Sequence, residues 1–333
     1  MAGSLQMQLV QESSKNGPPY MSPVALSGGL PTADVDIAIC SVLAMLYLYG
    51  GVSFIRLIKM NSKKQHKFLL IILMIQFCMS RVVTCILRIV WSKFIHNIRL
   101  AIAAQIFVAA GILVVYVINM ELSKRCLRAF KPSIGWSPIV KIVYTTLYSL
   151  VVCCLIMVIT MTIITYYTLN QHTRTIASWI QRGAITYLLV IAVVPLVVLA
   201  LTFAPPHLPI QQPFGTGRNV TKLATLLVGT CLCTLIAGFR AGTTWMPVRM
   251  ATNPAWYHTK PAFYCFSFVP EIIVIYVYLI VRIDKRFHVP DGSSKMRSYA
   301  KQPEQRPVGH RPEDIDLESL HSETKSDKDR ETI

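Results

Sequence analysis

Residues 142–167 read IVYTTLYSLVVCCLIMVITMTIITYY and contain no Asp, Glu, Lys or Arg. An α-helix rises about 1.5 Å per residue, so about 20 apolar residues cross the roughly 30 Å hydrocarbon core of a bilayer. This run is longer than that requirement. The sequence therefore predicts a membrane-spanning helix over residues 139–168.

Six further apolar stretches of similar length flank this run. They cover residues 36–58, 68–91, 98–120, 183–204, 220–240 and 262–281. The composition agrees, because 53% of the chain is hydrophobic, only 15% is charged, and the mean hydropathy is +0.49. A soluble domain carries about 25% charged residues. We therefore expect an all-α, polytopic membrane bundle of seven transmembrane helices over residues 34–288.

The basic residues of the connecting loops predict the orientation of the bundle. One side of the predicted membrane carries 15 Lys and Arg residues and the other carries eight. Cytosolic loops hold the excess of Lys and Arg. We therefore expect the N-terminus outside and the C-terminus in the cytosol. The Asn219-Val220-Thr221 sequon then faces the cytosol, where it stays unglycosylated.

The two terminal segments differ in composition from the spans. Residues 1–33 are rich in Gly, Pro, Ser and Gln, which predicts a disordered extracytosolic arm. Residues 289–333 hold eight basic and ten acidic residues with few large apolar ones. Such a segment cannot bury enough apolar surface to fold alone, so we expect a disordered cytosolic tail.

The net charge of +17 raises the question of nucleic acid as a partner. Residues 1–288 contain 25 Lys and Arg residues against six acidic ones, and the excess lies in short loops beside the spans. Basic residues at that position meet anionic lipid headgroups. We expect membrane lipids as partners and no nucleic acid.

Charged side chains inside the spans are the strongest functional signal. Arg81, Arg88 and Glu271 lie within predicted spans, where each charge costs about 2.5–3.5 kcal/mol on insertion scales. Arg81 and Arg88 are two helical turns apart on one face. Glu271 lies at about the depth of Arg81, which predicts an ion pair. Whether such a pair binds a ligand or only joins two helices stays open.

Arg240 ends the sixth span and adds positive charge to the outer half of the bundle. Arginine holds phosphate or carboxylate groups through a planar fork of donors. We therefore take Arg81, Arg88, Arg240 and Glu271 as candidate ligand-binding residues for an anionic or amphiphilic small molecule. The alternative for Arg88 and Arg240 is that both side chains extend to the lipid headgroups.

A second cluster of charges ends the third span on the predicted cytosolic side. Glu121, Arg125 and Arg128 lie there, and we consider them candidates for coupling to a cytosolic signalling partner. The alternative is a basic anchor that only fixes the orientation of the chain.

Enzyme and cofactor motifs are absent from the sequence. It contains no His-Glu-x-x-His metal site, no Gly-x-Ser-x-Gly nucleophile turn and no phosphate-binding glycine loop. The predicted seventh span, residues 262–281, has no lysine that could form a Schiff base with retinal. We expect no enzymatic activity, no metal and no cofactor.

Several sequence blocks carry a resemblance to a known group of proteins. They include Ala103-Ala104-Gln105-Ile106-Phe107, Lys124-Arg125-Cys126-Leu127-Arg128, Phe239-Arg240-Ala241-Gly242 and Pro270-Glu271. Over about residues 35–290 the chain resembles an uncharacterised family of fungal seven-span membrane proteins. The arginine that ends the sixth span and the glutamate in the seventh are similar, more distantly, to the fungal Rta-like lipid-translocating exporters. A further glutamate of those exporters is missing, because Ala241-Gly242-Thr243-Thr244 follows Arg240.

Two functions remain open from the sequence. The first is an integral membrane protein that binds, and translocates, a lipid or an amphiphilic small molecule. The second is a seven-transmembrane receptor or sensor that signals through its cytosolic loops and tail. Fold alone does not choose between them. We expect the plasma membrane rather than an endomembrane.

Overall fold

The computed structural model describes residues 2–62, 69–203 and 214–289. Within these ranges, seven helical segments are long and apolar enough to cross a membrane. No strand occurs there beyond an isolated antiparallel bridge between Val24 and Met250. The prediction of an all-α, seven-helix membrane bundle is confirmed.

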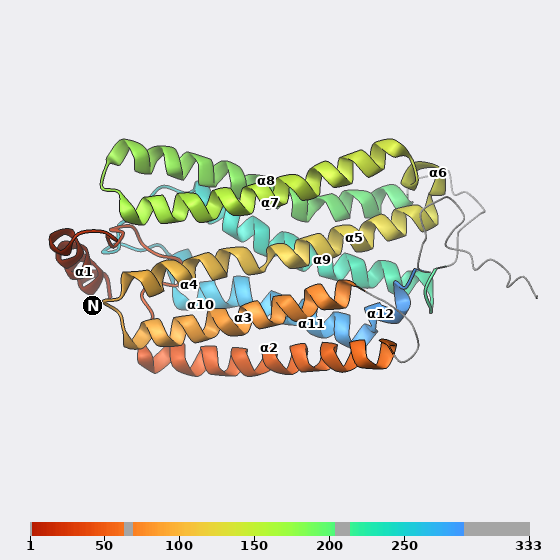
Figure 1. Ribbon diagram of the computed structural model, residues 1–333, viewed down its shortest axis with the longest axis horizontal. Coiled ribbons are helices and arrows are strands. Elements are labelled where there is room, and N and C mark those ends of the chain that lie inside the picture. Colours follow the sequence, from red (N-terminus) through yellow and green to blue (C-terminus); the bar gives the residue numbers. More distant parts are fainter. Residues whose placement is uncertain (1, 63–68, 204–213, 290–333) are drawn as a thin grey trace, which may run out of the picture.

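The spanning helices run side by side along the long axis of the molecule (Figure 1). Five spans are single helices: α2 (Ala33–Ser62), α3 (Leu70–Lys93), α7 (Pro138–Tyr167), α8 (Gln171–Phe203) and α9 (Asn219–Trp245). The third span consists of α4 (Ile98–Gly111) and α5 (Leu113–Phe130). The seventh consists of α10 (Lys260–Phe263), the π-helix η2 (Tyr264–Phe268) and α11 (Val269–Val281). The short elements are α1 (Ala2–Asn16), α6 (Pro132–Gly135), η1 (Trp256–His258) and α12 (Ile283–Arg286).

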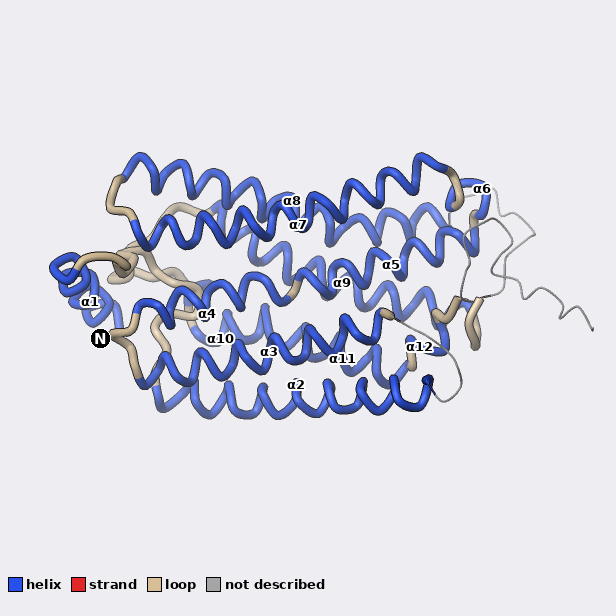
Figure 2. The backbone as a smooth tube through the Cα atoms, viewed as in Figure 1, coloured by secondary structure: helices blue, strands red, loops and turns tan. Residues whose placement is uncertain are grey.

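Loops gather at the two ends of the bundle (Figure 2). We call the end that carries α1 the N-terminal end and the end that carries α6 and α12 the C-terminal end. Local sequence signals set several helix starts. The side chains of Asn97 and Ser137 accept hydrogen bonds from the backbone of Leu100 and Val140, which caps α4 and α7. The C-terminus of α11 is set by Arg282, whose backbone takes a left-handed conformation with φ 57°.

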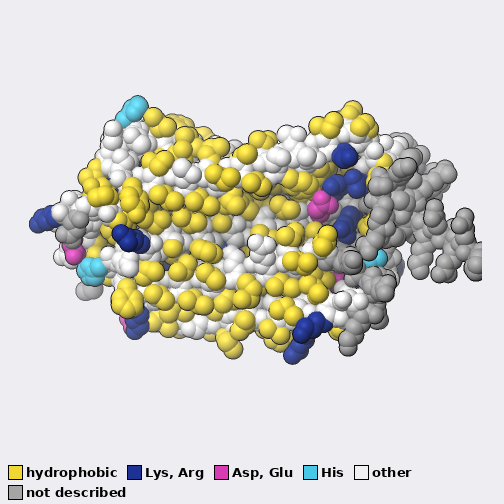
Figure 3. Space-filling view, viewed as in Figure 1, with side chains coloured by type: hydrophobic (Ala, Val, Ile, Leu, Met, Phe, Trp, Pro, Cys, Tyr) yellow, Lys and Arg dark blue, Asp and Glu magenta, His cyan; other side chains and the backbone are white. Residues whose placement is uncertain are grey.

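Hydrophobic side chains cover most of the visible face of the bundle, and basic side chains gather towards its ends (Figure 3). Of the seven spans, the helix α7 is the least buried, with 11% of its most apolar 18 residues inside the protein. Aromatic residues fill the core between α2, α3 and the seventh span, among them Tyr47, Phe54, Phe77 and Phe268. An apolar exterior around a packed interior is what a lipid environment requires.

Two span boundaries differ from the predicted ones by ten residues or more. The fifth span was expected to begin near residue 183, but α8 begins at Gln171. Its first turns are polar, so they contribute little hydropathy although their backbone is helical. The third span was expected to end at residue 120, but α5 continues to Phe130. Apolar content therefore marks the membrane-buried part of a helix and not its ends.

The predicted disordered arm is wrong for the described residues 2–32. Residues 2–16 form α1, and the side chains of Leu9, Met21 and Leu30 are buried in a small cluster with Trp91 of α3. Gly, Pro and Ser interrupt the apolar residues of this segment, so that no long apolar run reveals the side chains that anchor it. The predicted tail lies outside the described residues from residue 290 onward.

Candidate functional site

The seventh span changes its helical geometry next to Glu271. Pro270 has no backbone N–H to donate, and the five-residue π-helix η2 immediately precedes the first turn of α11. Such π-turns often occur at functional sites. The carbonyl of Phe268 accepts a hydrogen bond from the Tyr47 hydroxyl at 3.3 Å. This local geometry directs Glu271 towards α2 and α3.

Arg81 and Glu271 form the predicted ion pair. Arg81 Nη2 lies 2.5 Å from Glu271 Oε1, and both side chains are 2% exposed. The Tyr47 hydroxyl donates to the second carboxylate oxygen at 3.0 Å. The depth argument from sequence is therefore confirmed, and the pair connects α3, α11 and α2.

The remaining surroundings of Arg81 belong to the protein itself. Its Nη1 donates to the carbonyls of Phe107 and Val108, which lie in α4. Its guanidinium carbon lies 5.5 Å from the ring centres of both Phe77 and Phe268. Gly111 packs against it so closely that an added Cβ would lie 2.9 Å from the guanidinium carbon. These contacts surround the Arg81 side chain on several sides.

Arg88 also has a buried partner. Its Nε donates to Asp36 Oδ1 at 2.9 Å and lies 3.0 Å from the Tyr264 hydroxyl. Lys260 Nζ is 2.5 Å from the other carboxylate oxygen of Asp36. Because the Arg88 residue is only 3% exposed, the alternative in which it extends to the lipid headgroups is wrong. This cluster joins α2, α3 and the start of the seventh span.

A cavity of about 320 Å³ lies in the N-terminal half of the bundle. It is surrounded by α4, α5, α7, α8, α9 and the start of the seventh span, and residues 22–27 contribute to its wall. Its volume is near the lower end of the 300–1,000 Å³ that is typical of small-molecule sites. Its lining residues include no Asp, no Glu and no Lys among the described part of the chain.

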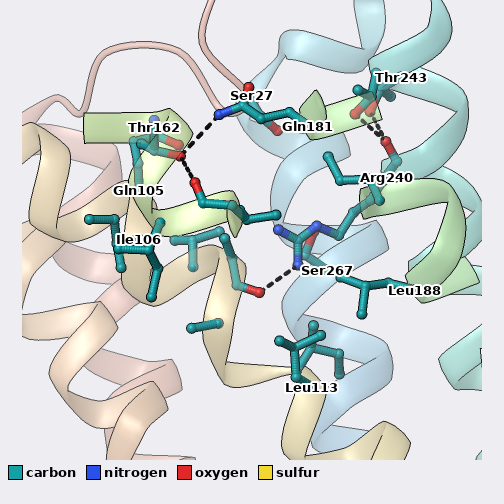
Figure 4. A pocket seen from close by; sticks show the side chains of 18 of the residues that line it. Ser27, Gln105, Ile106, Leu113, Thr162, Gln181, Leu188, Arg240, Thr243 and Ser267 are labelled. Carbon is teal, nitrogen blue, oxygen red and sulfur yellow. Dashed lines mark hydrogen bonds between the residues drawn. The ribbon is translucent and has the colours of Figure 1, made fainter. Parts of the chain in front are cut away.

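Arg240 is the charged residue of this cavity. Its Nη1 donates to the carbonyl of Ala109 at 3.2 Å, and Figure 4 shows its side chain pointing into the space between the helices. Within the described residues no carboxylate lies at ion-pair distance from Arg240. A guanidinium that faces a cavity with one neutral acceptor keeps further donors available for an anion.

The cavity walls change from polar to apolar along its depth. Thr162, Gln181 and Thr243 lie towards the N-terminal end, where Gln181 Nε2 donates to Thr162 Oγ1 at 3.2 Å. Leu113, Leu155 and Ala237 lie further towards the middle of the bundle. Figure 4 shows Thr162, Gln181 and Thr243 on one side of the space and Leu113 on the other. The cavity is therefore amphipathic.

The three candidates at the other end of the bundle contact their own chain. Glu121 Oε1 accepts hydrogen bonds from Lys124 and from the Tyr148 hydroxyl, each at 2.9 Å. Arg125 Nη1 donates to the carbonyl of Phe287 at 2.8 Å. Arg128 stacks on the Trp136 ring at 4.3 Å. All three side chains are partly buried, and the contacts fix α5 against α7, α6 and the segment after α12.

The C-terminal end contains a further carboxylate that the sequence did not single out. Asp284 of α12 accepts hydrogen bonds from Asn61 at 3.0 Å and from Arg282 at 2.9 Å. Burial opposes ionisation, but the hydrogen bonds and the charge of Arg282 outweigh it, so the pKa of Asp284 is lowered. The helix α12 is thereby tied to the end of α2.

The candidate ligand-binding residues thus separate into two groups. Arg81, Glu271 and Arg88 occupy buried ion pairs, whereas Arg240 lines the cavity. Sequence reasoning missed the neutral lining residues Gln105, Thr162 and Gln181. Each of these three residues is a polar residue within or beside an apolar stretch of the sequence. That pattern is a weak indication of a site, because threonine and glutamine also occur in ordinary spans.

A comparison with known proteins adds one match. The sequence model of a family described as "Protein of unknown function (DUF3112)" matches residues 211–288. The matched region includes Arg240 and Glu271 and excludes Arg81 and Arg88. No curated protein and no solved structure matches the chain. The resemblance to fungal Rta-like exporters stays a prediction.

Proposed function

We propose that this integral membrane protein binds a small anionic amphiphile in the cavity around Arg240, as the first step of moving it across the membrane. The observation that carries the proposal is the cavity-facing arginine without a carboxylate partner in the described residues. An unpaired cation in a space of low polarity attracts an anion more strongly than it would in water.

The shape of the cavity supports an amphiphile rather than a simple inorganic anion. Apolar residues such as Leu113 and Leu155 suit a hydrocarbon chain, and Thr162 and Gln181 suit a polar group nearer to the N-terminal end. A volume of about 320 Å³ suits a small single-chain molecule better than a two-chain phospholipid. We therefore place the anionic group at Arg240 and the apolar chain towards the middle of the bundle.

The neighbouring ion pair contributes to the charge of the site. Arg81 and Glu271 both interact electrostatically with Arg240, although neither lines the cavity. Two arginines and one glutamate leave one net positive charge in this part of the interior. Since a single anion neutralises that charge, a monoanionic ligand fits the site best.

Binding of fluorescent fatty acids, which carry a single negative charge, to purified protein in nanodiscs tests the proposal. Removing a charge-assisted hydrogen bond costs about 1.5–3 kcal/mol, so Arg240→Gln should weaken binding about 10- to 100-fold. Arg182→Gln is the matched control, since Arg182 stacks on Trp179 and Trp245 outside the cavity lining. Equal affinity in Arg240→Gln and native protein would refute the site.

Flux separates transport from reception. Liposomes that contain the protein should move the same fluorescent amphiphile between leaflets faster than protein-free liposomes, and Arg240→Gln should reduce that rate. Binding without flux would instead support the receptor or sensor. In that case, neutralising Arg125 and Arg128 would be expected to abolish signalling while leaving binding intact.

A further inference from the structure

A segment before the first span forms part of the cavity wall at the N-terminal end. We call residues 20–30 the N-terminal lid. Four residues of the lid, Ser22, Val24, Leu26 and Ser27, contribute to the cavity lining. The remaining lining residues all belong to the spanning helices. The lid therefore lies between the cavity and the space beyond the N-terminal end of the bundle.

The lid pairs with the loop after α9 in the manner of two short antiparallel strands. The amide of Ala25 donates to the carbonyl of Arg249 at 2.9 Å, and the amide of Ala251 donates to the carbonyl of Pro23 at 3.0 Å. Val24 and Met250 lie opposite one another between these two bonds. This pairing is short and lies at the N-terminal end, beyond the helices that surround the cavity.

Contacts with other elements hold the ends of the lid. The amide of Tyr20 donates to the Tyr166 carbonyl at the end of α7, and Arg88 Nη2 donates to the Gly28 carbonyl at 2.9 Å. Met21 and Leu30 are buried, with exposures of 2% and 3%. Between these anchors Ser22, Val24 and Leu26 are half-buried and Ser27 is exposed, whereas Ala25 and Gly28 are buried. The lid is thus fixed at both ends and less buried in its middle.

The helix α1 holds this middle part down through one side chain. Gln6 Nε2 donates to the carbonyls of Ser22 and Val24 at 2.8 and 3.0 Å. Gln6 itself is 3% exposed. Segments with few buried apolar contacts and short backbone pairing open locally at low free-energy cost.

We propose that the N-terminal lid is the gate of the cavity: the ligand reaches Arg240 when residues 23–25 separate from residues 249–251. This inference rests on the proposed function, because it concerns access to the same cavity. The anchors at Met21 and Leu30 keep the opened lid attached. The gate predicts that changing a contact between the lid and another element alters the rate of ligand binding, even if that contact is outside the cavity.

A reversible cross-link tests the gate. Val24 and Met250 form a non-hydrogen-bonded antiparallel pair, whose Cα atoms are typically about 4.5 Å apart, within the range of a disulfide. The variant is Val24→Cys with Met250→Cys, made in a background in which the exposed Cys153, Cys231 and Cys265 are replaced by serine. Association of a fluorescent fatty acid is compared between the oxidised and the reduced form of this same protein. The Val24→Cys single variant, treated identically, controls for the reagents.

We expect the association rate to fall at least tenfold on oxidation and to recover on reduction. Equal rates in the two redox states would overturn the gate and would indicate that the ligand enters sideways from the membrane. A lack of binding in the reduced form and in native protein would instead refute the proposed function. The two failures are therefore distinguishable.

A second variant loosens the lid instead of locking it. Gln6→Ala removes the two hydrogen bonds to the lid, which end on the backbone carbonyls of Ser22 and Val24. Gln6 itself does not line the cavity. Gln8→Ala on the exposed side of the same helix is the control. The gate predicts faster association and faster dissociation in Gln6→Ala, with both rates unchanged in Gln8→Ala. Unchanged rates in Gln6→Ala would contradict the proposal.

Discussion

Removing one partner of the Arg81–Glu271 pair should destabilise the bundle, whereas removing both should not. The two charged atoms are 2.5 Å apart, and each side chain is 2% exposed. Loss of one member of a buried pair costs about 3–5 kcal/mol, because the other charge stays buried. Replacing both members by apolar residues of similar size is often neutral or stabilising.

The structure indicates how large the loss should be for Glu271→Gln. Arg81 then keeps its charge, since an arginine in a protein does not give up its proton. It also keeps the carbonyls of Phe107 and Val108 and the faces of two aromatic rings. Because these contacts remain, we expect the free energy of unfolding to fall by about 3 kcal/mol, the lower limit of the range for a broken buried pair. At about 2–4 °C per kcal/mol, the unfolding temperature should fall by roughly 6–12 °C.

Native cysteines supply the assay. Cys78, Cys85 and Cys233 are buried and free, whereas Cys153, Cys231 and Cys265 are exposed. With these three exposed cysteines replaced by serine in every variant, a thiol-reactive dye labels the protein only when the bundle unfolds. Heating in detergent with such a dye should give lower transition temperatures for Glu271→Gln and Arg81→Met. The double variant Arg81→Met/Glu271→Met should return to within about 4 °C of the native protein, or about 1 kcal/mol.

Two results would refute this reasoning in different ways. A double variant that loses the sum of the two single losses would show that the residues are not coupled. A double variant that folds well but no longer binds the fluorescent amphiphile would show that the pair belongs to the binding site. The expected result is retained binding, because neither side chain lines the cavity.

Three further predictions concern the packing around Arg81, the pH dependence of stability and the orientation of the bundle. Gly111→Ala brings a methyl group to 2.9 Å from the guanidinium carbon of Arg81 and should cost about 1–3 kcal/mol in the thermal assay. Gly183→Ala meets nothing within 4 Å and should be neutral or slightly stabilising. Burial, and then the charge of Arg249, lower the pKa of His258 below its ordinary 6.5, so protonation opposes the folded state. The unfolding temperature should therefore fall between about pH 7.5 and about pH 5, and His258→Gln should flatten this pH dependence. His172→Thr turns the exposed Asn170-Gln171-His172 into a glycosylation acceptor at the N-terminal end. In a eukaryotic host, a glycan there and none on Asn219 would establish the predicted orientation, whereas a glycan only on Asn219 would reverse it.

The spans could be predicted because lipid imposes one simple requirement on the sequence. Every backbone polar group must be satisfied inside the segment, so an apolar run such as residues 142–167 has a helix as its stable form. That requirement ends at the membrane surface. The polar start of α8 at Gln171 and the folded residues 2–32 therefore escaped the hydropathy pattern.

The charged residues could be predicted in part. Matching the depths of Arg81 and Glu271 was enough to find one pair, because both lie far from either end of a span. The partner of Arg88 was harder to find. Asp36 lies only a few residues inside α2, and the cluster depends on Lys260 and Tyr264 from the start of the seventh span. Contacts between three elements need their relative rotation, which a single sequence does not reveal.

Of the three arginines Arg81, Arg88 and Arg240, the one without a carboxylate partner in the described residues identifies the candidate binding site. A cation inside a bundle persists when a buried anion compensates it, as Glu271 does for Arg81 and Asp36 does for Arg88. Such compensation leaves little attraction for a further anion. Arg240 has no carboxylate at ion-pair distance in the described residues, yet it faces a cavity that a small molecule can occupy. Because a bound anion would supply the missing compensation, ligand binding should also stabilise the fold. A saturating fatty acid should therefore raise the unfolding temperature of native protein and have little effect on Arg240→Gln.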